Sequence, residues 1–167
     1  MYNLKTLLLG NNRLSALSEQ IGKLQKLQKL YLSENFLSYL PNQIGDLQEL
    51  KQIYLRGNQL TSESFPDSFF YLIQLQWLGL ANNQLTFLPG KIGHLQDLHW
   101  LNVENNELTE LPEEIGDLEK LIHLQIVEDS YPNRFDNLKG KHLRLNWTLP
   151  SPKITDAKMR EYPISYF

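Results

Sequence analysis

One leucine pattern recurs along most of this chain at a nearly constant interval of 23 residues. Its frame is L-x-x-L-x-L-x-x-N-x-L, with Ile or Val in place of Leu at a few positions. Successive copies begin at Leu4, Leu27, Leu50, Leu75 and Leu98. A sixth copy begins at Leu121 and has Asp129 where the other five have Asn. A fixed period of this size predicts a solenoid, because one unit cannot bury its own apolar side and must stack on its neighbours.

The fourth and sixth positions of the frame predict one short β-strand per unit. Both are apolar and lie two residues apart, which is the spacing of a strand with one buried face. Strands that recur once per unit are expected to pair side by side in a parallel sheet. The Asn that follows each strand has two donors and an acceptor, so a column of them can satisfy the backbone groups of the turns. We expect this structural ladder at Asn12, Asn35, Asn58, Asn83 and Asn106.

A second motif, Leu-Pro-x-x-Ile-Gly-x-Leu, fills the other half of the unit. It occupies residues 40–47, 88–95 and 111–118. In this form the chain resembles the 23-residue class of leucine-rich repeats in bacterial proteins and in intracellular Ras-group and Scribble-like scaffolds. The resemblance covers roughly residues 4–128. It implies an α/β horseshoe solenoid with a short-stranded parallel sheet on the concave face and irregular, 3-10 or short helical segments on the convex side. We expect a solenoid of about six repeats over residues 1–128 and a capping segment over residues 129–167.

The strand positions that alternate with the core positions point away from the core. In the family that this chain resembles, they form the concave surface on which partners usually dock. Tyr31 and Tyr54 share one such position, and Trp77 and Trp100 share another. Neighbouring strands would place each pair side by side, about 4.8 Å apart. The predicted partner-binding residues are Tyr31, Tyr54, Trp77, Trp100, Lys29, Arg56, Asn102, Glu104 and His123.

The sequence leaves the role of this aromatic band open. Aromatic residues favour strands and pack on cross-strand neighbours, which would give a face without a ligand. The interpretation we favour is a solvent-facing platform that binds a protein or a peptide, since Trp, Tyr and Arg dominate binding hot spots. One alternative is a carbohydrate or cell-wall ligand, because sugar rings also stack on Trp and Tyr. Another is that the repeats are a fragment of a larger signalling protein.

Catalytic motifs are absent from the sequence. It has no nucleotide-binding, metalloprotease or serine-hydrolase motif, and its four His residues fall at different positions of the repeat. An open curved sheet also implies no pocket. We therefore expect a protein with no enzymatic activity, no cofactor and no metal.

Cysteine is absent, which excludes disulfide-bonded caps and cysteine-ligated zinc. The sequence shows neither a signal peptide nor an apolar stretch long enough to span a membrane. These features predict a cytoplasmic protein, while a trimmed N-terminus would leave a secreted or surface location open.

Charge is distributed unevenly along the chain. Residues 1–138 carry a net charge of −7, with many of the acids in the fifth and sixth units, and residues 139–167 carry +4. This asymmetry predicts either a solvated acidic flank with the basic segment folded back on it or an acidic docking surface for a basic partner. The basic residues are too dispersed to predict nucleic-acid binding.

The N-terminal end of the predicted sheet has little to cover it. Only three residues precede Leu4, so the strand edge at Leu7 and Leu9 would be bare. An unpaired strand edge invites pairing with another chain. We consider two hypotheses, a homodimer through this edge and a chain cut from a longer protein.

Overall fold

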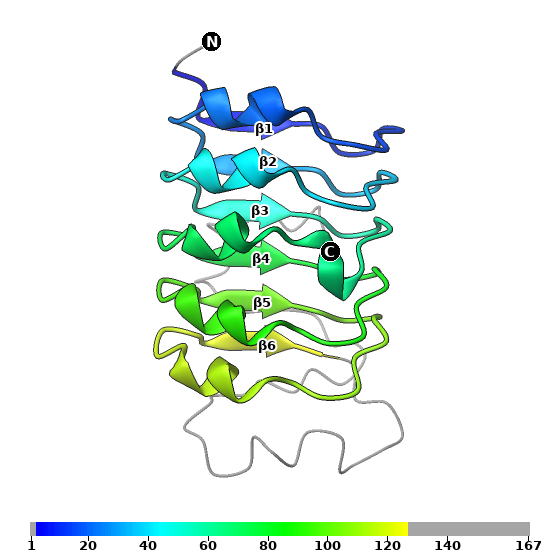
Figure 1. The fold of residues 1–167 in the computed structure, drawn as a ribbon, viewed down its shortest axis with the longest axis vertical. Coiled ribbons are helices and arrows are strands. Elements are labelled where there is room, and N and C mark those ends of the chain that lie inside the picture. Colours follow the sequence, from blue (N-terminus) through cyan, green and yellow to red (C-terminus); the bar gives the residue numbers. More distant parts are fainter. Residues whose placement is uncertain (1–2, 127–167) are drawn as a thin grey trace, which may run out of the picture.

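The computed structural model describes residues 3–126, which form one six-stranded parallel sheet. The strands follow one another in sequence order from β1 to β6, as Figure 1 shows. They are β1 (Thr6–Leu8), β2 (Lys29–Tyr31), β3 (Gln52–Tyr54), β4 (Trp77–Gly79), β5 (Trp100–Asn102) and β6 (His123–Gln125). Each strand pairs in the same register with the next, so equivalent positions of successive repeats are direct neighbours.

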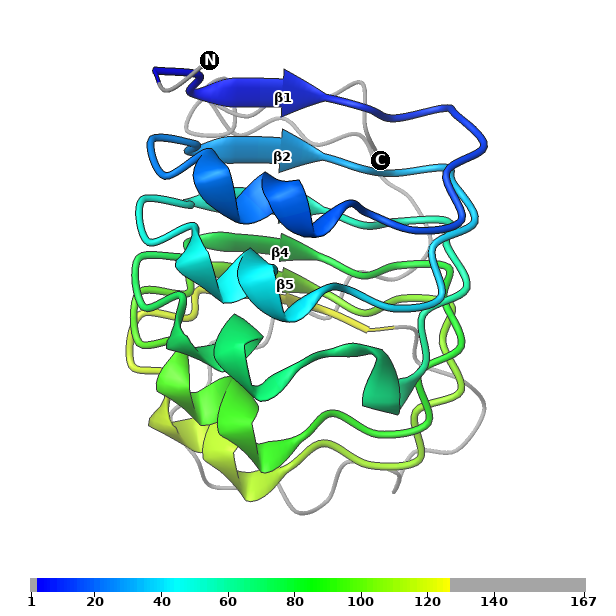
Figure 2. The same cartoon turned by 45° about the horizontal axis from the view of Figure 1, so that its top comes forward.

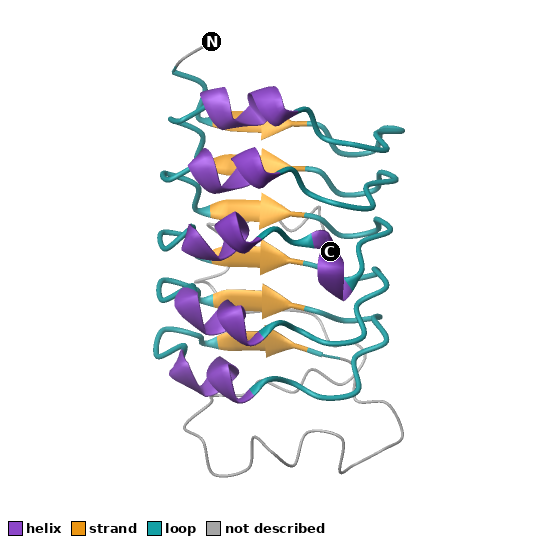
Figure 3. Cartoon of the chain, in the orientation of Figure 1, coloured by secondary structure: helices purple, strands orange, loops and turns teal. Residues whose placement is uncertain are grey.

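A row of short 3-10 helices covers one side of this sheet (Figure 3). They are η1 (Glu19–Lys23), η2 (Asn42–Asp46), η3 (Ser62–Ser64), η4 (Asp67–Tyr71), η5 (Gly90–His94) and η6 (Glu113–Asp117). In the Leu-Pro-x-x-Ile-Gly motif the Pro stands just before the helix, as Pro41 does before η2 with φ −70°. A Pro suits this place because its fixed φ matches the extended conformation and no helical N–H is lost.

The core lies between the sheet and the row of helices (Figure 2). Inward-facing strand residues meet the Ile or Phe of each five-residue helix. The central core residues Leu30, Ile53, Leu78 and Leu101 are all fully buried. The helices stack closely enough that a Cβ on Gly45 would lie 2.5 Å from the Cβ of Ser68 in the next repeat. Glycine at this position therefore sets the spacing of the repeats.

The Asn column connects each repeat to the one before it. The Oδ1 of Asn58 accepts a hydrogen bond from the Leu37 N–H at 3.0 Å. Its Nδ2 donates to the carbonyls of Leu32 and Leu55 at 3.0 and 2.9 Å. The equivalent Asn residues at positions 35, 83 and 106 bond in the same way. The side chain thereby satisfies turn groups that would otherwise be buried without partners.

The residue just before each ladder Asn has a left-handed backbone. The φ angles run from 52° to 65° at Asn11, Glu34, Gly57, Asn82 and Asn105. Asn and Gly adopt this conformation readily, whereas Glu does not. The backbone of Glu34 is therefore strained, whereas the Asn and Gly residues at the other four positions suit this conformation.

Two extra residues in the third repeat form an additional turn, η3, that ties the second repeat to the fourth. The Ser62 hydroxyl donates to the Phe87 carbonyl at 2.8 Å and accepts from the Thr86 and Phe87 N–H groups, both at 3.0 Å. On the other side, the Ser64 hydroxyl donates to the Ser38 carbonyl at 2.6 Å. Both serine residues are buried.

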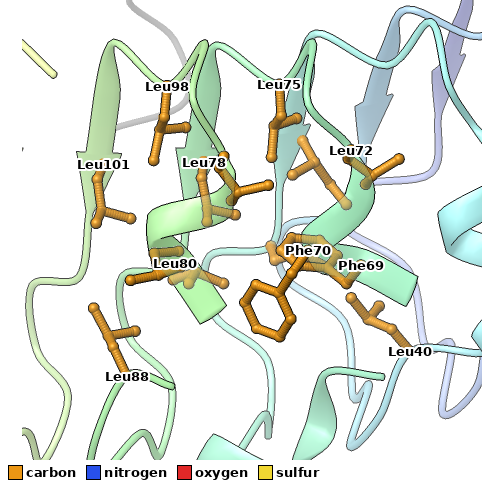
Figure 4. Close-up of a cluster of buried hydrophobic side chains, with 14 of the residues drawn as sticks. Leu40, Phe69, Phe70, Leu72, Leu75, Leu78, Leu80, Leu88, Leu98 and Leu101 are labelled. Carbon is orange, nitrogen blue, oxygen red and sulfur yellow. The ribbon is translucent and has the colours of Figure 1, made fainter. Parts of the chain in front are cut away.

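The same repeat replaces the usual Ile-Gly pair with Phe69 and Phe70. Figure 4 shows these rings within the leucine core, beside Leu40 and Leu72. Their planes are nearly perpendicular, at 85° with centroids 5.4 Å apart, which is a favourable edge-to-face contact. The insertion therefore places two large rings in the core and adds serine hydrogen bonds to the neighbouring repeats at its edge.

The predicted solenoid is confirmed, with its parallel sheet and its 3-10 convex side. Within residues 3–126 the convex helices are all of the 3-10 type. The capping segment expected over residues 129–167, and Asp129 of the sixth unit, lie outside the described residues. The domain boundary at residue 128 thus stays a prediction.

Candidate functional site on the concave face

The candidate site is the sheet face opposite the 3-10 helices, which we call the concave face. Strand alternation sends the first and third residue of each strand to this face, while the middle residue enters the core. The neighbours along the two resulting rows are set by the register of the sheet. Tyr31 lies beside Tyr54, and Trp77 lies beside Trp100, as the sequence predicts.

The four aromatic rings form one continuous cluster, separate from the leucine core. Tyr31 and Tyr54 stack with centroids 4.5 Å apart and planes 5° from parallel. Trp77 and Trp100 stack at 4.4 Å and 8°. Tyr54 and Trp77 join the two pairs at 5.7 Å, with their rings tilted by 36°. The imidazole of His123 extends the series by packing on Trp100 at 4.4 Å.

The aromatic stack crosses from one row of strand residues to the other at Gly79. Tyr54 belongs to the row of third strand residues, whereas Trp77 belongs to the row of first strand residues. A Cβ on Gly79 would lie 3.7 Å from Trp77 Nε1 and 3.8 Å from Tyr54 Cδ1, which is ordinary contact. Both rings therefore lie over a strand residue with no side chain. The Tyr54 hydroxyl also donates to Gln52 Oε1 at 3.3 Å, which fixes the ring from the neighbouring row.

The expectation that these rings face solvent is wrong. Tyr31, Tyr54, Trp77 and Trp100 are only 4–6% exposed, whereas Leu8, beside Tyr31 on the same face, is 64% exposed. Part of the reason is the stacking itself, because each ring covers the face of its neighbour. The alternation of a strand determines to which side a residue points, but not what else covers that side.

A polar group borders the aromatic stack on β5 and β6. The Asn102 amide donates to Gln125 Oε1 at 2.8 Å, and Asn102 Oδ1 accepts from the Glu104 N–H at 2.9 Å. Farther along the turns, the Asn105 amide donates to Asn82 Oδ1 at 2.7 Å. The amides are thus partly engaged with each other. The Glu104 carboxylate supplies negative charge next to them.

Charged residues border the other end of the stack. Lys29 is half-buried at the start of β2. Arg56 forms an ion pair with Glu34, with Nε 3.5 Å from the carboxylate oxygen. One of the two predicted basic residues, Arg56, is therefore paired with Glu34, which is not among the predicted partner-binding residues.

The predicted partner-binding residues did not include Ser33, Glu34 and Gln52. Ser33 and Gln52 are buried on this face, at 6% and 7% exposure. Among the described residues, the Ser33 hydroxyl has no hydrogen-bond partner. A buried hydroxyl without a partner costs about 1–3 kcal/mol, so this group favours any occupant that can bond to it. The two-residue alternation of the strand was the available signal, because Ser33 lies two residues after Tyr31, just beyond the end of β2.

Two negative findings apply to residues 3–126. They hold no group of three or more His, Asp or Glu side chains placed to bind a metal ion. In that same part of the chain, none of the helices has the length and apolar character needed to cross a membrane.

Comparison with protein families identifies the repeats. Residues 67–146 match a leucine-rich repeat region, and residues 2–60 and 49–72 match two leucine-rich repeat families. The finer 23-residue class suggested by the Leu-Pro-x-x-Ile-Gly motif is not distinguished by these matches. No curated protein sequence matches the chain significantly.

Solved structures show the same architecture. A leucine-rich repeat protein of Leptospira interrogans is 36% identical with a TM-score of 0.72, and the match covers 80% of this chain and 34% of that one. The ectodomain of the Arabidopsis thaliana receptor kinase GASSHO1/SCHENGEN3, in complex with CASPARIAN STRIP INTEGRITY FACTOR 2, is 31% identical with a TM-score of 0.64, covering 86% and 18%. The plant peptide hormone receptor RGFR1, in complex with RGF2, is 26% identical with a TM-score of 0.60, covering 73% and 24%.

The chain spans about a third or less of the length of these three structures. Their shared fold and the family matches agree with the register, the Asn column and the 3-10 helices described above. The chain is a leucine-rich repeat solenoid.

Proposed function

We propose that this leucine-rich repeat solenoid binds a protein or peptide on its concave face and catalyses no reaction. The observation that supports this most directly is the aromatic stack across four strands, on the side of the sheet opposite the described 3-10 helices. Trp, Tyr and Arg are the residue types that dominate binding hot spots, and all three occur in or beside this stack. Two of the similar structures are plant receptors in complex with the ligands named above, which is consistent with this use of the fold.

In this proposal the rings and the charges have different roles. The four stacked rings, which are 4–6% exposed, provide apolar contact area where the stack reaches the surface of the face. Glu104, on the β5 side, attracts a basic group of the ligand, while Lys29 and Arg56, on the β2 side, attract an acidic one. Asn102 and His123 complete the polar border. A bound peptide would therefore lie across the strands with its basic end toward β5.

Selection of a peptide library on the immobilised full chain tests this proposal. We expect selected peptides to contain Lys or Arg and to bind the Glu104→Gln variant about tenfold more weakly, a change of about 1.4 kcal/mol. Glu107→Gln is the matched control, because Glu107 is an exposed acid of the same repeat outside the strand rows. Equal weakening by both variants, or by neither, would contradict a site on the concave face.

The carbohydrate alternative is disfavoured by the geometry of the rings. Sugars stack on the faces of aromatic rings, but here Trp77 and Trp100 cover each other at 4.4 Å, and the two tyrosine rings do so at 4.5 Å. The other alternative, that the repeats belong to a larger signalling protein, stays a prediction. A cytoplasmic location also stays a prediction, since two of the similar structures are plant receptors, one of them described as an ectodomain.

A homodimer through the N-terminal edge is a separate proposal. Within the described sheet β1 is an outer strand, and its Leu8 is 64% exposed. Light scattering on the full chain tests it: we expect a dimer that Leu8→Lys converts to a monomer, because charge on an edge opposes pairing. A monomeric wild-type protein at high concentration would refute it.

A further inference from the structure

We propose that the side of the solenoid around η3 is a second binding surface, which takes a Lys or Arg side chain of a protein partner. Its central residues are Tyr39, Glu63 and Phe87, which together we call the η3 surface. In Figure 3, η3 stands apart from the row of five-residue helices, among the loops that follow the strands. The proposal goes beyond the proposed function, because none of these three residues belongs to a strand of the sheet.

Two exposed aromatic residues lie on either side of η3. Tyr39 and Phe87 are each the fourth residue after a ladder Asn, in the second and fourth repeats. They are 51% and 41% exposed. The first and fifth repeats have Ala16 and Glu110 at this position, so the repeat pattern does not require a ring here. Exposed rings add little to stability, and exposed apolar side chains that are grouped together mark interaction sites.

The turn η3 fixes the backbone that carries both rings. Ser64 bonds on either side of Tyr39: its hydroxyl donates to the carbonyl of residue 38 at 2.6 Å, and its carbonyl accepts from the N–H of residue 40 at 2.9 Å. The Ser62 hydroxyl bonds both backbone groups of Phe87, accepting from the N–H at 3.0 Å and donating to the carbonyl at 2.8 Å. A backbone that is already held in place loses less freedom when a partner binds.

The spacing of the two aromatic positions suits one cation. Just before them, backbone hydrogen bonds join each repeat to the next. The Gln59 N–H donates to the Leu37 carbonyl, and the Gln84 N–H donates to the Leu60 carbonyl, both at 2.9 Å. The second and fourth repeats are therefore about 10 Å apart here, or two strand spacings. Rings carried on such positions can both lie within about 6 Å of one cation between them, the range over which a ring attracts it.

Charge on this side favours a basic partner. The side is formed by residues 15–16, 38–39, 61–64, 86–87 and 109–110. These segments contain two acids, Glu63 and Glu110, and no Lys, Arg or His. Both acids are exposed, and neither takes part in an ion pair within residues 3–126. Glu63 lies in the first turn of η3, between the repeats that carry the two rings. A carboxylate between two rings complements an ammonium or guanidinium group.

Peptide selection with prior depletion tests the proposal. A displayed random peptide library is first depleted on the full-length Tyr39→Ser/Phe87→Ser variant, which keeps the residues of the concave face, and is then selected on the wild-type full chain. We expect the surviving peptides to be enriched in Lys or Arg. They should bind Glu63→Gln about three- to fivefold more weakly, the upper range for one exposed charge pair.

Glu19→Gln is the matched control for Glu63→Gln. Glu19 is also an exposed acid in the first turn of a 3-10 helix, but it lies in η1. The surviving peptides should bind this variant as tightly as the wild type. Survivors without a basic side chain, equal binding to Glu63→Gln and wild type, or the absence of any survivor would overturn the proposal.

Amide chemical shifts of the isotope-labelled wild-type chain locate the bound peptide without any variant. We expect a surviving peptide to cause the largest shift changes at residues 38–40, 61–64 and 86–88. Tyr71→Ala should leave its affinity unchanged, because Tyr71 is an exposed ring on η4, outside the η3 surface. Largest changes on the strands β2 to β6 would overturn the proposal, even if the depletion variant were less stable than the wild type.

The η3 surface and the concave face can fail separately. Glu104→Gln should leave the surviving peptides unaffected, and Glu63→Gln should leave peptides of the concave face unaffected. If the survivors depend on Glu63 while no library peptide depends on Glu104, the η3 surface stands and the proposed function fails. If the survivors depend on Glu104 and not on Glu63, the η3 surface is refuted and the concave face stands.

Discussion

At the scale of single residues, the Asn column makes the repeats dependent on one another. Replacing Asn58 with Leu leaves the buried Leu37 N–H without its acceptor, while the Leu32 and Leu55 carbonyls keep the Asn35 and Asn83 amides as donors. We expect a loss of about 1–3 kcal/mol in the free energy of unfolding, the cost of an unsatisfied buried donor. Urea denaturation measures it.

Asn12 provides the matched control for this substitution. It is exposed, and among the described residues its amide donates only to the Leu9 and Gly10 carbonyls of its own turn. Asn12→Leu should therefore cost well under half as much as Asn58→Leu. Equal costs would mean that the column contributes through local turns alone.

A substitution at Glu34 is expected to raise the free energy of unfolding rather than lower it. Its φ of 56° is costly for Glu, and Asn occupies the same place in three other repeats. We expect Glu34→Asn to raise stability by about 0.5–1 kcal/mol, since relief of left-handed strain exceeds the loss of an exposed ion pair with Arg56. Glu34→Ala, which loses the pair and keeps the strain, should be no more stable than wild type in thermal denaturation. A gain in Ala equal to that in Asn would show that the carboxylate, rather than the backbone, is unfavourable.

The sequence predicts the structural role of a residue when that role depends on nearby positions of the repeat. It does not predict a role that depends on distant parts of the fold. The Asn column follows from one residue type recurring after one strand, so its five positions could be assigned without a structure. The left-handed backbone before it is visible as Asn or Gly at four of five positions, with Glu34 as the exception. The burial of Trp77 and Trp100 could not be predicted, because strand alternation says nothing about what lies above the sheet.

At the scale of elements, the aromatic stack contributes to stability as well as to the candidate site. Trp100 is 4% exposed and contacts both Trp77 and His123. Replacing it with Ala should cost about 3 kcal/mol, in the range of buried aromatic truncations. Phe87→Ala, at a ring that is 41% exposed, should change stability by about 0.5 kcal/mol. A cost near 0.5 kcal/mol for both would show that the stack is open to solvent in solution.

The η3 turn is the element that the repeat pattern could not predict. Two extra residues were visible as a period of 25 between Leu50 and Leu75, but their role depends on partners in two other repeats. Ser62 bonds forward to residues 86 and 87, while Ser64 bonds back to residue 38. A pattern within one repeat contains no information about such cross-repeat contacts.

Removal of the Ser62 hydroxyl tests how much these cross-repeat hydrogen bonds contribute to stability. In Ser62→Ala the part-buried N–H groups of Thr86 and Phe87 lose their acceptor, which should cost about 1–2 kcal/mol because water can reach part of this turn. The Phe87 amide should also exchange faster with deuterium than in the wild type. Glu63→Ala is the control, because Glu63 is exposed in the same turn. If the two variants are equally stable, the insertion is a passive loop.

At the scale of the whole molecule, a solenoid is stabilised by contacts between neighbouring repeats, so stability should vary along its axis. Leu7 and Leu78 occupy the same position of the frame, but Leu7 is only half-buried and Leu78 is fully buried. Leu78→Ala should cost about 2–5 kcal/mol and lower the midpoint of the whole transition, since it leaves a cavity between two supporting repeats. Leu7→Ala should cost less and mainly accelerate hydrogen exchange in β1, which is an outer strand of the sheet formed by residues 3–126. Equal effects of the two substitutions on the global midpoint would mean that the first repeat is as firmly held as the fourth, and that something covers the β1 edge in solution.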